Sequence, residues 1–160
     1  MKRIILTGFE PFGDYKFNPT QDIAKEYDGK EIRDIEVIGL VLPCTYYSAH
    51  NYLKSFTKSL APDAILSLGL SSSVKGFRFE KFGKNWMDGK YKDANGFNPK
   101  GMPIIEGGKE FYGVNSNILG LANNLSNSNL PFEISENADA FICNSLIYLT
   151  SMNFLKIIYQ

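Results

Sequence analysis

The first 68 residues alternate between strand-like and helix-like segments, and this order constrains the fold more than any other feature of the sequence. Apolar, β-branched runs cover residues 3–7, 35–42 and 64–68, and helix-like segments cover 18–27 and 48–60 between them, the second with apolar residues at helical spacing. The resulting βαβαβ order predicts parallel strands joined by right-handed crossovers, with helices on the faces of the sheet. We therefore expect an α/β fold with three αβα layers, a largely parallel central sheet and a buried third strand at 64–68.

Start and stop signals lie between these segments. Asn18 and Pro19 predict a helix start, because asparagine caps the first turn and the fixed φ of proline suits the first helical position. Gly29 is expected to end that helix, and Pro62 breaks the second. Since ligands of parallel sheets bind at the carboxyl ends of the strands, we expect the loop 9–17 and the loop after Leu68 to line a site.

The second half of the chain is less regular. Residues 76–87 interleave aromatic and basic side chains, which predicts a solvated hairpin or an excursion from the main sheet. Residues 88–108 are rich in glycine and are expected to be mostly loop. For the remainder we expect a helix over 114–125, a polar turn over 123–129, short strands over 132–135 and 138–142, and a last helix from about Cys143.

Length and charge exclude several classes of protein. The 160 residues favour one domain with a sizeable core, and 17 acidic against 17 basic residues give no reason to expect a nucleic-acid or anionic-membrane partner. Apolar runs are too short for a membrane span. The two cysteines, Cys44 and Cys143, show no zinc-site spacing, so we expect free thiols, no metal or cofactor, and a cytoplasmic location.

Cys143 is the residue with the clearest chemical potential. An apolar segment ends there and a helix-like segment begins, and the N-terminus of a helix lowers a thiol pKa and favours the thiolate. With the aromatic loop that carries Phe9 and Phe12, this pattern indicates a nucleophile facing an apolar pocket. The same residues also fit a buried core cysteine and core aromatics. The one histidine, His50, falls in a helical stretch where we expect it to be exposed, so no base is evident.

A set of short motifs follows one another in a characteristic order along the chain. The most specific is the opening loop, in which a strand leads into two phenylalanines and a proline. In order, the motifs are Leu6-Thr7-Gly8-Phe9-Glu10-Pro11-Phe12-Gly13, Asn18-Pro19, Val41-Leu42-Pro43, Pro62-Asp63, Gly69-Leu70, Glu80, Asn85, Asp88 and Ile142-Cys143-Asn144. This series resembles the pyroglutamyl peptidase I (pyrrolidone-carboxylate peptidase) family of cysteine peptidases, from the first strand to the end of the chain.

The resemblance implies an α/β, phosphorylase/hydrolase-like fold and a cysteine exopeptidase that removes N-terminal pyroglutamate (5-oxoproline) from peptides. The family uses a Cys-His-Glu or Cys-His-Asp triad, so Cys143 would be the nucleophile and Glu80 the acidic member. Phe9 and Phe12 would line the pocket for the lactam ring, and Asn18 would fix the loop or the substrate, although its role as a helix cap is sufficient by itself. Leu70 and Ile142 would complete the substrate site, the former through backbone groups.

Three departures accompany the resemblance. The family histidine belongs beyond the helix that follows the cysteine, and no residue of this chain matches it. Lys90 stands where family members usually carry an arginine, and 71–75 replace a turn with glycine and arginine. We therefore expect a single domain over 1–160 that lacks the family's C-terminal part and has weak or lost activity. The alternative is a non-catalytic pseudoenzyme that keeps the fold and a binding pocket. An edge or helix face left uncovered would favour a homo-oligomer, either a dimer or a tetramer.

Overall fold

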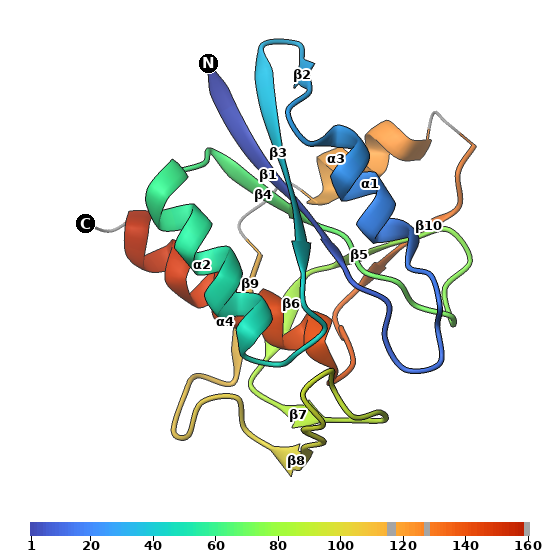
Figure 1. Cartoon of the computed structure of the whole chain (residues 1–160), viewed down its shortest axis with the longest axis vertical. Helices are drawn as coiled ribbons and strands as arrows, with labels where there is room; N and C mark the ends of the chain where they lie inside the picture. The colour runs from blue at the N-terminus through green and yellow to red at the C-terminus, as the bar shows by residue number, and fades with distance from the viewer. Residues whose placement is uncertain (115–117, 127–128, 159–160) are drawn as a thin grey trace. The chain divides into compact units, whose positions relative to one another are not determined.

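The computed structural model describes the backbone of residues 1–114, 118–126 and 129–158, with side chains up to residue 153 (Figure 1). The chain forms two compact units, one made of residues 1–70 and 91–98 and the other of residues 71–90 and 99–160. Within the described ranges, no helix is both long enough and apolar enough to cross a membrane.

The first unit is built on a four-stranded sheet in the order β2-β3-β1-β4. Its strands are β1 (Lys2–Phe9), β2 (Glu31–Ile32), β3 (Ile35–Leu42) and β4 (Ala64–Ser67). β1 pairs in parallel with both β3 and β4, and only the two-residue β2 runs antiparallel. The predicted α/β fold with a largely parallel sheet is confirmed.

Two helices connect these parallel strands, α1 (Pro19–Tyr27) and α2 (Ser48–Leu60) (Figure 1). The chain moves outward from β1 to β3 through α1 and returns past β1 to β4 through α2. Right-handed crossovers in opposite directions place the helices on opposite faces of the sheet. α1 lies so close to the sheet that a Cβ on Gly39 would come within 1.9 Å of the carbonyl oxygen of Ala24. The apolar positions of helix and strand therefore meet in a dense core.

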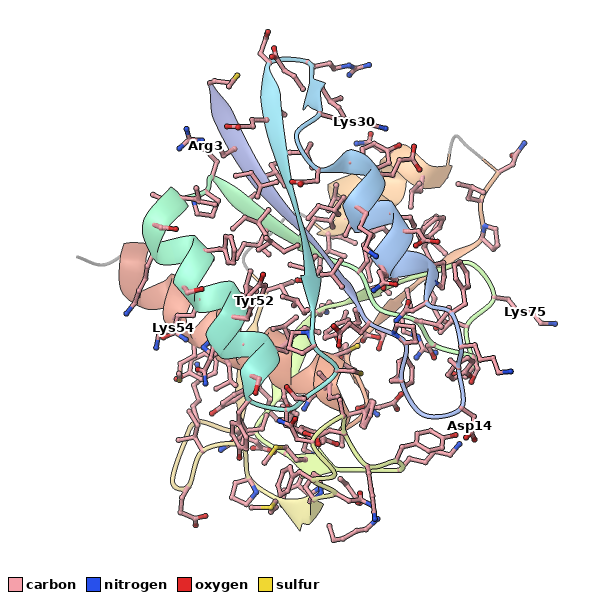
Figure 2. All side chains as sticks on the ribbon, in the orientation of Figure 1. Arg3, Asp14, Lys30, Tyr52, Lys54 and Lys75 are labelled. Atoms are coloured by element: carbon pink, nitrogen blue, oxygen red, sulfur yellow. The ribbon has the colours of Figure 1, made fainter. Side chains whose placement is uncertain are left out.

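Ion pairs of this unit lie at its surface. Arg3 pairs with Glu36 across β1 and β3 at 2.9 Å, and Lys30 pairs with Glu26 at 3.2 Å (Figure 2). Exposed pairs of this kind contribute about 0–1 kcal/mol each. The stability of the first unit therefore depends mainly on its apolar core.

The prediction that residues 64–68 form a buried strand was wrong. The strand β4 forms, but it lies at the end of the sheet and pairs with β1 on one side only. Leu66 is 51% exposed, although it is apolar. A short apolar run does not reveal whether its strand is central or at an edge, because the number of neighbours depends on distant segments.

Among its described residues, the second unit contains three two-stranded sheets and two helices. The pairs are β5 (Phe77–Glu80) with β10 (Phe132–Ser135), β6 (Phe82–Lys84) with β9 (Phe111–Gly113), and β7 (Met87–Asp88) with β8 (Lys100–Met102). The first pair is parallel and the other two are antiparallel. α3 (Ile118–Ser126) contacts β10, whereas α4 (Ile142–Ile158) contacts β6, β7 and β9. α4 is therefore the element around which most of this unit is assembled.

Several expectations for the second half need correction. Of the two alternatives for residues 76–87, the hairpin is wrong and the excursion from the main sheet is confirmed, because the strands there pair in separate sheets with segments further along the chain. Arg78 and Lys81 pair with the acids Glu133 and Glu136 of the segment that pairs with β5. The strand expected over 138–142 does not form, because residues 138–141 form a turn and Ile142 begins α4. α3 begins at Ile118 and continues to Ser126, which replaces part of the expected polar turn, whereas 115–117 and 127–128 lie outside the described residues.

Gly39→Ala tests the close packing of α1 on the sheet. The new Cβ would overlap backbone atoms of α1, which cannot move aside as a flexible side chain can. Overpacking of this kind costs about 3 kcal/mol, so we expect the urea midpoint followed by circular dichroism to fall accordingly. Gly113→Ala is the control, because its Cβ would meet Phe82 at an ordinary 3.5 Å. Equal midpoints for the two variants would contradict the packing described here.

Candidate active site

Cys143 is the second residue of α4 and follows a tight turn. Asp139 adopts a φ of 59° in that turn, a left-handed conformation that Asp tolerates better than most residues. The backbone N–H of Asp88 donates to the carbonyl oxygen of Ala140 at 3.1 Å, which ties the turn to β7. The Cys143 side chain is half-buried, and the predicted position of the thiol at the start of a helix is confirmed.

The side chain of Asn144, the residue after the thiol, joins α4 to β6 and β7. Its Oδ1 accepts from the backbone N–H of Lys84 at 2.8 Å, and its Nδ2 donates to the carbonyl oxygens of Lys84 and Trp86, both at 2.9 Å. Asn144 is fully buried, so each of these bonds replaces water that the amide would otherwise need. The sequence motif included Asn144 without a role for it. A polar residue at the start of an otherwise apolar helix was the feature of the sequence that could have indicated this role.

Glu80 ends β5 and is half-buried in the same unit. Its Oε1 lies 3.9 Å from the Nε of Arg78. Its Oε2 is buried, and within the described part of the chain no group forms a hydrogen bond with it. Burial raises the pKa of this carboxyl above its ordinary value, and Ser135 and Arg78 offset only part of the rise. Glu80 thus has a buried oxygen that lacks a hydrogen-bond donor among the described residues.

The thiol and this carboxyl influence each other. Burial raises the pKa of the Cys143 thiol to about 11, and the negative charges of Glu80 and Asp139 contribute to the rise. A backbone hydrogen bond at the helix start lowers the pKa by less than these effects raise it. The prediction of a lowered thiol pKa was therefore wrong, because desolvation and neighbouring acids outweigh the helix N-terminus.

His50 does not provide a base in the unit of Cys143. It lies in α2 of the first unit, where it is buried beside Ala49 and three residues before Leu53 on the same helix face. Burial, with a smaller effect of Lys54, lowers the pKa of His50 to about 4, so the ring is neutral at pH 7. The expectation of an exposed histidine was wrong, because the three-residue spacing from His50 to Leu53 places both side chains on the buried face of α2.

Four of the predicted substrate-binding residues belong to the first unit. Phe9 ends β1 and is buried, and Phe12 packs on Tyr15 with ring centroids 5.2 Å apart. Asn18 is buried and accepts from the backbone N–H of Thr20 at 3.2 Å, so its cap role is confirmed. Leu70 is half-buried in the loop after β4.

Asn18 also fixes the opening loop, because its Nδ2 donates to the carbonyl oxygen of Glu10 at 3.2 Å. The remaining predicted residue, Ile142, is buried at the start of α4 in the second unit, next to Cys143. The other cysteine, Cys44, is buried in the first unit, and neither cysteine forms a disulfide in the described structure, in agreement with the prediction. Across the residues that the structure describes, no cluster of His, Cys, Asp or Glu could hold a metal ion.

A further loop, 91–98, belongs to the first unit although both its flanking segments belong to the second. The buried carboxylate of Asp93 accepts from the backbone N–H groups of Tyr46, Asn95 and Phe97 at 2.9–3.2 Å. The ring of Tyr91 lies close to Gly13 in the opening loop, at 3.9 Å from a Cβ built there. Asp93 therefore holds an aromatic side chain beside the loop of Phe12, a contribution that sequence reasoning missed.

Comparison with known proteins decides the family. A family profile described as pyroglutamyl peptidase matches residues 2–158. The chain belongs to the pyroglutamyl peptidase family. A pyrrolidone-carboxylate peptidase from Oceanobacillus iheyensis is 35% identical over 148 residues, which are 92% of this chain and 74% of the relative. That of Thermococcus litoralis is 32% identical over 98% of this chain and 71% of the relative.

Solved structures agree. The crystal structure of pyrrolidone carboxyl peptidase from Pyrococcus furiosus matches this family member with a TM-score of 0.93 at 32% identity, covering 99% of this chain and 76% of that one. The Thermococcus litoralis structure matches with a TM-score of 0.92 over 98% of this chain and 71% of that one. The resemblance inferred from the motifs is confirmed.

Alkylation of Cys143 tests the electrostatics of the site. With a thiol pKa of about 11, iodoacetamide labelling read by peptide mapping should be slow at pH 8 and should rise up to pH 10 and beyond. Glu80→Gln removes a nearby negative charge and should lower the thiol pKa by about one unit. The thiolate fraction then rises about tenfold, while the less basic thiolate reacts more slowly, so labelling should be about threefold faster. The exposed acid Glu106 supplies the control, Glu106→Gln. A Glu80→Gln rate equal to the control would contradict the described electrostatics.

Asn144→Ala tests the tie between α4 and the strands. Loss of three hydrogen bonds at a buried position should lower the free energy of unfolding by about 2–4 kcal/mol. Asn153→Ala in the same helix removes a bond to the carbonyl oxygen of Leu149 and should cost about 1 kcal/mol or less. An Asn144 variant as stable as this control would exclude the proposed tie.

Proposed function

We propose that this chain acts on peptides with an N-terminal pyroglutamyl residue, with Cys143 as the nucleophile and Glu80 as the acidic member of the site. The observation that carries the proposal is the pair itself. This family member has a thiol, Cys143, at the start of α4. The carboxyl of Glu80 is close enough to alter the pKa of that thiol. One oxygen of this carboxyl is buried and lacks a hydrogen-bond partner among the described residues. Such an oxygen suits a donor that a catalytic site would place between acid and thiol.

For the substrate's lactam ring, the family resemblance indicates Phe9, Phe12, Asn18 and Leu70 of the first unit and Ile142 of the second, and this assignment stays a prediction. The ring is flat and uncharged, with one N–H and one C=O, so apolar walls can bury its methylenes while backbone groups satisfy the amide. Support for this assignment comes from the aromatic loop after β1, which Asn18 holds through Glu10 and Thr20. A direct contact between Asn18 and the substrate stays a prediction.

The reaction follows from the groups involved. The Cys143 sulfur attacks the carbonyl carbon of the peptide bond that joins pyroglutamate to the next residue. The carbon–nitrogen bond of that peptide bond then breaks, and the leaving amine takes up the proton that the thiol has lost. Water then hydrolyses the thioester, which releases pyroglutamate and restores the thiol. Both steps need a group that moves a proton, and loss of such help costs about 10²–10⁴-fold in rate. The one histidine of the chain, His50, is buried and its pKa is lowered to about 4, which makes it a weak base, so we infer that the 160-residue chain is a weak peptidase.

A non-catalytic role is the second candidate, and one observation favours it. The Cys143 pKa of about 11 leaves about one thiol in 10⁴ ionised at pH 7, which is the opposite of an activated nucleophile. Under this alternative, the chain binds pyroglutamyl peptides and does not cleave them.

Hydrolysis of a fluorogenic pyroglutamyl amide separates the two candidates. We expect turnover about 10²–10⁴-fold below that of the Thermococcus litoralis peptidase, abolished in Cys143→Ala and increased by added imidazole, which can carry the proton. Cys44→Ala, at the other cysteine, should keep the turnover. Binding without turnover at any imidazole concentration would favour the non-catalytic role. Turnover that survives in Cys143→Ala would refute the assignment of the nucleophile.

A further inference from the structure

A polar cavity of about 540 Å³ lies within the second unit, beside the turn that leads into Cys143. Its lining includes the ammonium-bearing side chains Lys84, Lys90 and Lys100, the carboxylates Asp88 and Asp139, and the ring of Trp86. The basic groups outnumber the acidic groups by three to two. Neither the thiol chemistry nor the aromatic loop of the first unit uses this cavity.

Hydrogen bonds join the cavity wall to the residues around the thiol. The Asn144 side chain binds the backbone of Lys84 and Trp86, and the Asp88 N–H binds the carbonyl oxygen of Ala140. Asp139 lines the cavity and is also near enough to Cys143 to affect the pKa of the thiol. A molecule whose reacting carbon sits at the sulfur therefore has this cavity next to it.

The chemistry of the cavity differs from what a lactam ring needs. A pyroglutamyl ring carries no charge, whereas three lysines and two aspartates line this cavity. Lys100 is anchored at the wall, since its Nζ donates to the carbonyl oxygen of Gly89 at 3.0 Å. The excess of positive charge favours an anion over a cation.

We propose that the cavity binds the carboxylate of the peptide on the leaving side of the scissile bond, so that short pyroglutamyl peptides with a free C-terminal carboxylate are preferred. This inference rests on the proposed function. An extended residue spans about 3.3–3.6 Å, so the carboxylate of a leaving group of one or two residues lies about 4–7 Å from the carbon under attack. Lysine side chains, which carry their charge on a flexible stem, can meet a carboxylate over that range.

Trp86 makes the proposal measurable. It is the one tryptophan of the chain, it is 39% exposed, and it lines the cavity. Its fluorescence should therefore report a molecule that enters there. The Cys143→Ala chain, which prevents cleavage, is titrated at pH 7 with pyroglutamyl-alanine and with its carboxamide. These two ligands differ in one charge and share the lactam ring.

We expect the free acid to bind about 3- to 10-fold more tightly than the carboxamide at low ionic strength, as a few partly exposed charge pairs allow. In roughly 0.5 M NaCl the ratio should fall below about twofold, because salt screens exposed charges. The salt series needs no further variant and so does not depend on how a substitution folds.

Lys84→Gln should lower the ratio by about half or more at low salt, since its backbone bonds to Asn144 are kept while its charge is lost. Lys75→Gln, at a side chain that extends from the exposed loop before β5 (Figure 2), is the matched control and should keep the full ratio. Equal affinity for the two peptides, or equal ratios in the two variants, overturns the cavity assignment and leaves the proposed function standing. Absence of binding and cleavage of every pyroglutamyl peptide overturns both.

Discussion

The arrangement of the second unit depends on the buried amide of Asn144. Its three hydrogen bonds to Lys84 and Trp86 are made at a position from which water is excluded, so a displaced amide would leave donors and acceptors unsatisfied. The bonds hold α4 in one register against β6 and β7. Because Cys143 precedes this amide in the helix, the register also decides where the sulfur lies.

Close packing supports the same helix from another side. A Cβ on Gly83 of β6 would come within 2.3 Å of the backbone nitrogen of Tyr148, so only glycine allows the strand to approach α4 this closely. The hydroxyl of Tyr148 donates to the carbonyl oxygen of Lys109 at 2.7 Å, which ties the helix to the segment before β9. Helix and strands thus form a frame in which polar and apolar contacts agree.

The site inside this frame combines a thiol with acids, and among the described residues no positive charge lowers the pKa of the thiol. Arg78 lies near Glu80, but its closest ion pair is with Glu133. The thiol therefore experiences burial together with Glu80 and Asp139, and it stays protonated at neutral pH. An imidazolium between these two groups would donate a hydrogen bond to the buried oxygen of Glu80. It would also lower the pKa of the Cys143 thiol, because a nearby positive charge favours the thiolate.

Local signals in the sequence were sufficient for much of the first unit. Asn18, Pro19 and Gly29 mark the ends of α1 by their own backbone and side-chain preferences, and β3 and α2 have the predicted bounds. Features that depend on distant partners were missed or misjudged, among them the edge position of β4 and the turn at Asp139 in place of a strand. The family followed from motifs, whereas the direction of the thiol pKa did not, because it is set by residues that folding brings together.

Hydrogen exchange at the backbone amide of Lys84 tests most directly whether Asn144 holds the thiol-bearing helix. This amide donates to Asn144 Oδ1, so it should exchange as slowly as the amides within α4, only when the helix separates from β6. Exchange of the Lys84 amide at the rate of exposed loop amides such as those of residues 71–73 would contradict the arrangement.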